Sequence, residues 1–260
     1  MIKTRALFGE FLGTLILSVI GCSSVAFSVL FNVFDSIVPV ALIWGIGVAL
    51  AIYTTKSYSK AHLNPAVSLG FFIQKQINYK ELFSYWLFQL LGGFVAGLVV
   101  YLCFISKIKS FEDLNNIIPH TDSGSYTAAI FGEFFPNPGY KLKLSYVSQV
   151  SACAYECIGT FFLMWSILCS TRSEKISRYS PLIIGLTVSV LIVWIAPYTQ
   201  CGINPARDFG PRLVACFFHW GSGAFPDGDF SFFNVYIISP MMGAFLSSFL
   251  YEKMYKIVKG

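Results

Sequence analysis

One motif with hydrogen-bonding chemistry occurs twice in the sequence, as Asn-Pro-Ala at Asn64 and again at Asn204. Asparagine can cap the free N–H groups at a helix start, and proline at the first helical position loses no hydrogen bond by lacking an N–H. Each copy therefore predicts a helix that begins with a side-chain amide at its tip. A single copy would indicate an ordinary loop-to-helix junction. Two copies in matching contexts favour a shared functional centre.

A second pattern, Glu-x-x-Gly-Thr, precedes each copy, at Glu10 and at Glu156. The glutamate comes 54 residues (64 − 10) before Asn64 and 48 residues (204 − 156) before Asn204. A carboxylate within an apolar run is costly in a membrane unless it faces protein or water. The pair could therefore serve as a proton relay or as structural carboxylates that hydrogen-bond the loops.

Composition sets the class of protein. The 260 residues are 55% hydrophobic and only 12% charged, with a mean hydropathy of +0.66, whereas soluble domains have about 25% charged residues. We therefore expect one all-α, multi-pass integral membrane domain over residues 1–260. The net charge of +5 comes from basic residues that flank apolar runs, which indicates membrane orientation and no nucleic-acid partner. The seven cysteines show no metal-type spacing and predict no disulfide framework.

The apolar runs predict six membrane spans. The stretches behind the Asn-Pro-Ala copies, 67–73 and 208–215, are too short for a span of about 20 residues, so we interpret them as half-helices. The segment 106–144 carries charges, prolines and glycines, which predicts a long loop that is functional or mobile. The predicted spans cover 6–30, 36–55, 82–105, 145–170, 181–197 and 232–251.

Three spans in each half make the repeat inverted, because an odd number starts the second half on the opposite side of the membrane. The repeats are about 1–105 and 145–260. Placing both termini on the cytoplasmic side puts most Lys and Arg residues inside, as the positive-inside rule requires. The half-helices then enter from opposite faces and meet near mid-membrane.

Non-helical backbone at that depth is tolerated where it lines a water-filled path, so this arrangement predicts a pore. Two helix N-termini at the meeting point carry partial positive charge and oppose cations. The amides of Asn64 and Asn204 can donate to a passing oxygen. The permeant is therefore expected to be neutral and able to form hydrogen bonds.

These paired motifs resemble the aquaporin and glycerol-facilitator family, also called the major intrinsic proteins, over essentially the whole membrane region. The resemblance implies six spans with two half-helices, one pore per subunit, a homotetramer in the lipid bilayer and no cofactor. No nucleophile–base pair, metal cluster or phosphate-binding glycine loop is apparent in the sequence, so no enzymatic activity is expected. It implies that Asn64 and Asn204 form the pore centre. It also implies supporting roles for a further set, namely Glu10, Glu156, His62 and Asp208.

The resemblance places a selectivity filter at Trp44, Ile192, Cys201 and Arg207. Trp44 is typical of glycerol-conducting members, Cys201 is typical of several water-selective ones, and Ile192 matches neither branch. An apolar wall of Trp44 and Ile192 opposite Arg207 suits a polyol, so we expect a channel for water and glycerol. Asp208 and Arg212, four apart on a helix, can pair as in the glycerol branch.

Other hypotheses stay open. Tyr236-Ile237, where glycerol facilitators have Pro-Leu, favours a strict water channel, and inverted repeats also occur in ion-coupled transporters. His62 is expected to pack in the loop or line the pore, with a pH gate as the alternative. His219 is interpreted as a neighbour of Trp220 with no further role. Lys60 stands where members of the resembled family usually have a glycine, just before Ala-His, and it could place a charge at the inner mouth or act as a gate.

Overall fold

The computed structural model describes residues 3–140, 147–226 and 230–259. Over these ranges the chain contains no strand, and six helical segments are long and apolar enough to cross a membrane, which confirms the predicted all-α membrane fold. The half-helices are α3 (Pro65–Ile73) and α8 (Pro205–Ala215). The long helices are α1 (Thr4–Phe31), α2 (Ile37–Thr55), α4 (Tyr79–Asn115), α6 (Gln149–Arg172), α7 (Ser180–Thr199) and α9 (Ser239–Lys259), the last preceded by a π-helical stretch, Phe233–Ile238.

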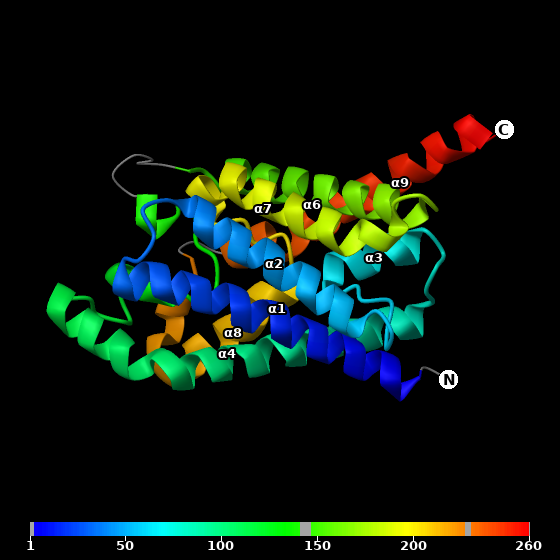
Figure 1. Ribbon diagram of the computed structural model, residues 1–260. Coiled ribbons are helices and arrows are strands. Elements are labelled where there is room, and N and C mark those ends of the chain that lie inside the picture. Colours follow the sequence, from blue (N-terminus) through cyan, green and yellow to red (C-terminus); the bar gives the residue numbers. More distant parts are fainter. Residues whose placement is uncertain (1–2, 141–146, 227–229, 260) are drawn as a thin grey trace.

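The long helices form a bundle around α3 and α8, and both chain ends lie at the same end of it (Figure 1). Helix α1 packs against α2 and α4, and α6 packs against α7 and α9 in the corresponding way. Helices α2 and α7 join the two groups. Each half-helix also packs against the last long helix of the other group, α3 on α9 and α8 on α4. Because of this exchange, the half-helices are held by both parts of the chain.

Glycines allow the closest helix crossings. A Cβ on Gly93 of α4 would lie 2.3 Å from the Ala206 carbonyl oxygen of α8, and a Cβ on Gly45 of α2 would lie 2.4 Å from the Gly185 carbonyl oxygen of α7. Both distances are too short for any side chain, so the backbones touch as small residues permit in membrane bundles. The crossing of α4 and α8 fixes the depth of the second half-helix.

The prediction that a loop begins at residue 106 is wrong. Helix α4 continues to Asn115, and its 37 residues span about 55 Å, well beyond a hydrocarbon core of about 30 Å. The extension is charged, which favours a loop, but Ile108 and Glu112, four apart on one face, are buried against protein. The rest of the segment contains a short helix at Ser125–Ala128 and a 3₁₀ turn at Pro138–Tyr140, and residues 141–144 lie outside the described ranges.

The other spans match within a few residues at most ends. The predicted start of the fourth span, 145, lies outside the described residues, and the helix begins at Gln149. The sixth helix runs to Lys259, beyond the predicted end at 251, because the basic tail continues the same helix. Its charges do not interrupt the helix, since lysine is a good helix former and can stay in water at a membrane boundary.

Candidate pore and selectivity site

The tips of the half-helices meet through their capping asparagines. Asn64 Oδ1 accepts from the N–H of Ala66 at 2.8 Å, and Asn204 Oδ1 accepts from the N–H of Ala206 at 3.1 Å. Each side-chain amide then crosses to the other loop. Asn64 Nδ2 donates to the Ile203 carbonyl and Asn204 Nδ2 donates to the Leu63 carbonyl, both at 2.9 Å. A carboxamide has two N–H donors, so each asparagine keeps one for a passing oxygen.

Each loop is shaped by a buried glutamate. The Glu10 carboxylate accepts from the N–H groups of His62 at 3.1 Å and Leu63 at 2.7 Å. In the second loop, Glu156 accepts from the N–H groups of Gly202 at 2.9 Å and Ile203 at 2.7 Å. Successive N–H groups that converge on one anion form a nest, a concave arrangement that binds negative charge.

The backbone of both nests adopts positive φ angles, which are uncommon for residues other than glycine. Ala61 and Leu63 have φ of 49° and 52°, and Cys201 and Ile203 have φ of 69° and 41°. Left-handed conformations are unfavourable for residues with a Cβ, so the two carboxylates stabilise strained loops. In a trans peptide the carbonyl points opposite to the N–H, so the carbonyls that precede these N–H groups point away from the glutamates. A row of acceptors results on the other side of each loop.

A cavity of about 190 Å³ runs along that side. It is lined by both asparagines and by the predicted filter residues Trp44, Ile192 and Cys201, together with Arg207. Neither glutamate is among the described residues that line it, which favours the loop-holding role over the proton relay. Since Asp208 is fully buried and also absent from this lining, it lies behind the pore wall.

A second cavity, of about 250 Å³, lies beyond the first on the side away from the chain termini. The two cavities share Trp44, Ile192 and Arg207 as lining residues, whereas Cys201 lines only the first. Residues that border both cavities form the boundary between them. Any solute that passes from one cavity to the other must cross this boundary.

The guanidinium of Arg207 has two fixed partners at the boundary. Its carbon lies 4.0 Å from the centre of the Trp44 ring, a close cation–π contact. Its Nη1 also forms an ion pair with Glu133, and both side chains are nearly buried. Glu133 is a site residue that the sequence analysis missed. No pattern around it indicates a contact, because it lies in the connection between α4 and α6 and meets Arg207 through tertiary packing alone.

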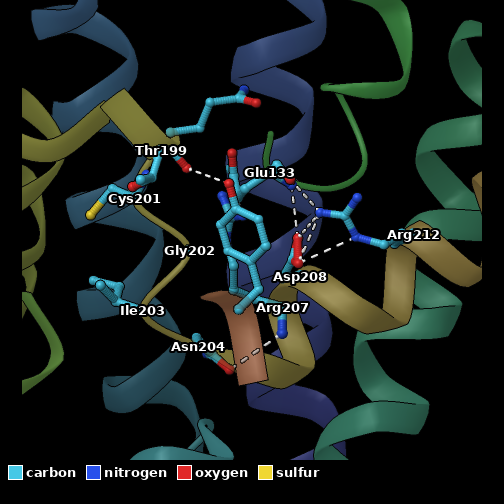
Figure 2. A network of polar contacts seen from close by, with 12 residues as sticks. Glu133, Thr199, Cys201, Gly202, Ile203, Asn204, Arg207, Asp208 and Arg212 are labelled. Atoms are coloured by element: carbon cyan, nitrogen blue, oxygen red, sulfur yellow. Dashed lines mark hydrogen bonds and ion pairs between the residues drawn. The ribbon is translucent and has the colours of Figure 1, made fainter. Parts of the chain in front are cut away.

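A polar network holds Glu133 in place (Figure 2). Its N–H donates to Asp208 Oδ1 at 2.8 Å, and Arg212 Nη2 donates to its carbonyl at 2.5 Å. Asp208 and Arg212 pair at 2.7 Å, which confirms the predicted i,i+4 pair. Helix α8 therefore carries Arg207 and also anchors the segment whose glutamate restrains Arg207.

His62 and Lys60 lie on the cavity wall toward the chain termini. The His62 ring stacks on Phe71 with centroids 4.3 Å apart, and its Nδ1 lies 3.2 Å from Ser68 Oγ. Lys60 Nζ donates to the Gln76 carbonyl at 2.5 Å, just beyond the C-terminal end of α3. His62 is thus a packed pore-lining residue. Lys60 places its charge at the cavity mouth.

The interpretation that His219 has no role beyond contact with Trp220 is wrong. His219 Nε2 lies 2.7 Å from Glu112 Oε2, and Thr127 Oγ1 donates to the same carboxylate at 2.5 Å. Trp220 Nε1 donates to Thr127 Oγ1 at 3.0 Å. No local pattern predicts this cluster, because the charged stretch that contains Glu112 favours a loop. The cluster ties the extension of α4 to the π-helical turn Cys216–Trp220 that follows α8.

Comparison with known proteins identifies the family of this chain. A family model described as major intrinsic protein matches residues 1–251. The chain therefore belongs to the major intrinsic protein family, and it is an integral, multi-pass membrane protein.

Several relatives share nearly the whole chain. It is 34% identical over 249 residues to the glycerol uptake facilitator protein of Shigella flexneri, covering 94% of this chain and 86% of that protein. It is 33% identical to aquaglyceroporin-2 of Rhizophagus irregularis, covering 95% and 76%. The solved structure of the aquaglyceroporin from Plasmodium falciparum superimposes with a TM-score of 0.79 at 25% identity, covering 96% of this chain and 95% of that one.

Proposed function

We propose that the protein is a passive channel through which glycerol and water cross a membrane, while ions and protons are excluded. The observation that carries this proposal is the boundary between the two cavities, where Trp44 and Ile192 present apolar surface beside the guanidinium of Arg207. The names of the relatives, glycerol uptake facilitator and aquaglyceroporin, support the same solute.

A polyol suits this boundary because one side of the boundary is apolar and the other side offers hydrogen-bond donors. Its carbon chain contacts the Trp44 and Ile192 side chains, while its hydroxyls accept from the donors of Arg207 that Glu133 leaves free. In the first cavity, the hydroxyls meet the remaining amide N–H groups of Asn64 and Asn204. Between these points they donate to the loop carbonyls, so a neutral solute exchanges its water hydrogen bonds for protein ones.

An ion that enters the path does not regain from the protein the interactions that it loses with water. A cation meets the positive ends of α3 and α8 and the N–H donors of Arg207 that Glu133 leaves free, and no acidic side chain is among the described residues that line the first, inner cavity. An anion loses its hydration between apolar walls. The second cavity is lined by Asp35 and Glu133, and Glu133 is paired with Arg207. The lack of acidic groups in the first cavity, around the pore centre, argues against an ion-coupled transporter with a midplane site for its coupling ion. The protein is accordingly proposed to be a channel and not an enzyme.

The same proposal assigns roles to the site residues. Asn64 and Asn204 orient the permeant at the centre, and Trp44, Ile192 and Arg207 select it. Cys201 lines the wall just inside the filter, where it leaves more room than an aromatic side chain would. The subunits assemble as a homotetramer with one pore each, and the exposed apolar side chains of the long helices contact lipid or neighbouring subunits. The termini face the cytoplasm.

The experiment that separates channel from carrier measures glycerol flux into proteoliposomes as the glycerol concentration rises, with and without proton and sodium gradients. A channel gives flux that increases linearly and ignores both gradients. Flux that saturates and depends on an ion gradient would instead assign the protein to the secondary transporters. Vesicles without protein provide the background rate.

A further inference from the structure

The mouth of the inner cavity on the side of the chain termini has a distinctive set of lining groups. They are the mouth cluster: Lys56, just after α2, Lys60, in the following loop, Ser177, in the 3₁₀ turn before α7, and Ser180, the first residue of α7. Helices α2 and α7 pack against each other, which brings these segments together. Two ammonium groups and two hydroxyls therefore surround one opening, and no carboxylate is among the described residues of the cavity wall.

Neither lysine is neutralised by a carboxylate in the described part of the chain. Lys60 Nζ donates to the Gln76 carbonyl, and Lys56 Nζ lies 4.6 Å from the centre of the Tyr53 ring. Glu174, three residues before Ser177, is exposed and does not line the cavity, whereas Glu81 and Glu252 have partners of their own. Glu81 completes a capping box with Asn78, and Glu252 pairs with Arg172 and Lys256. A carbonyl and a ring each leave the charge of an ammonium group available to an incoming anion.

The backbone adds to the positive potential. Helix α7 begins at Ser180 in the mouth cluster, and no side chain caps its first turn. The positive end of its dipole lies at the opening. Both lysines and this helix start border a cavity with apolar walls, and such walls concentrate the field of the charges at their rim.

We propose that the mouth cluster binds small oxyanions of the phosphate type and that a bound phosphate group obstructs entry to the pore from this side. Lysines supply point charges and serines supply hydroxyl donors, a combination that suits phosphate oxygens. The obstruction rests on the proposed channel function, but binding does not. The phosphate group comes from a soluble phosphate or from the headgroup of an anionic lipid, and the two sources are distinguished by experiment.

The first experiment measures binding without flux. Phosphorus NMR line broadening of inorganic phosphate is recorded with purified protein in nanodiscs of phosphatidylcholine. The test variant carries Lys56→Gln and Lys60→Gln. The matched control carries Lys80→Gln and Lys253→Gln, since these lysines lie over aromatic rings, as Lys56 does, but do not line the cavity.

Saturable broadening with the native protein and the control, and its loss in the test variant, is the expected result. Equal broadening with all three proteins, or none with the native protein, would overturn the proposal. Restoration by Lys56→Arg with Lys60→Arg shows that charge, and not a change in folding, is responsible. Elution at the same volume in size-exclusion chromatography checks that each variant is folded.

The second experiment identifies the source and the consequence. If phosphatidylglycerol in the nanodisc removes the broadening, a lipid headgroup occupies the mouth, whereas unchanged broadening assigns it to soluble phosphate. Glycerol flux into phosphatidylcholine vesicles is then measured in phosphate and in chloride at equal ionic strength. Slowing by phosphate that the test variant loses is expected. Binding without slowing would refute the obstruction, and an absence of glycerol flux in chloride would refute the channel function separately.

Discussion

The ion pair between Glu133 and Arg207 offers the sharpest test of how the filter is held. Glu133→Gln keeps the size of the side chain and one acceptor but removes its charge. A hydrogen bond to a charged group contributes about 1.5–3 kcal/mol and a neutral one about 0.5–1.5 kcal/mol, so the restraint on Arg207 weakens by about 1–1.5 kcal/mol. Because 1.4 kcal/mol corresponds to about tenfold in an equilibrium constant, the population of the restrained guanidinium falls by about five- to tenfold relative to other conformers.

The expected result is lower glycerol permeability, by up to about tenfold, because a guanidinium released from Glu133 occupies the boundary between the cavities. The assay is glycerol flux in proteoliposomes with equal protein content. Glu112→Gln is the matched control: it removes a second nearly buried carboxylate on the same side, but that carboxylate contacts His219 and Thr127. Unchanged flux in folded Glu133→Gln, or equal loss in both variants, would refute the restraint.

Three further predictions concern the pore wall and the packing around it. A thiol reagent added to native vesicles should block flux through Cys201, which lines the inner cavity, and Cys201→Ser should remove the block; persistent block would exclude this cysteine from the path. Gly93→Val should lower the thermal unfolding temperature sharply, since the added Cβ meets the Ala206 carbonyl and overpacking costs about 1–3 kcal/mol or more. The control Gly139→Ala should not lower it, because the atom nearest to its added Cβ is 3.4 Å away, and equal shifts in the two variants would contradict the assigned crossing of α4 and α8. Glu10→Gln should leave a loop N–H without a good acceptor and lower stability by about 1–3 kcal/mol, and an unchanged unfolding temperature would refute its loop-holding role.

Much of the membrane architecture could be predicted because it depends on local signals. Apolar runs give the spans, and the Asn-Pro pairs at Asn64 and Asn204 give the helix starts by capping chemistry alone. The pairing of Asp208 with Arg212 follows from helical spacing. The sequence allows either a proton relay or loop support for Glu10 and Glu156, and their contacts with the loop N–H groups favour support.

Features that depend on tertiary contacts could not be predicted. The extension of α4 is polar in composition, and only burial of Ile108 and Glu112 against other segments explains why it stays helical. Glu133 lies 74 residues before Arg207 and carries no local pattern. The partner of Lys60, the Gln76 carbonyl, is likewise set by how the loop returns to the end of α3.

Stopped-flow light scattering of proteoliposomes in a hyperosmotic glycerol solution tests the central claim most directly. The vesicles should shrink quickly as water leaves and then re-swell quickly as glycerol and water enter, both faster than in vesicles without protein. Fast shrinkage followed by re-swelling no faster than that of protein-free vesicles would contradict a glycerol channel and would leave a pore for water alone.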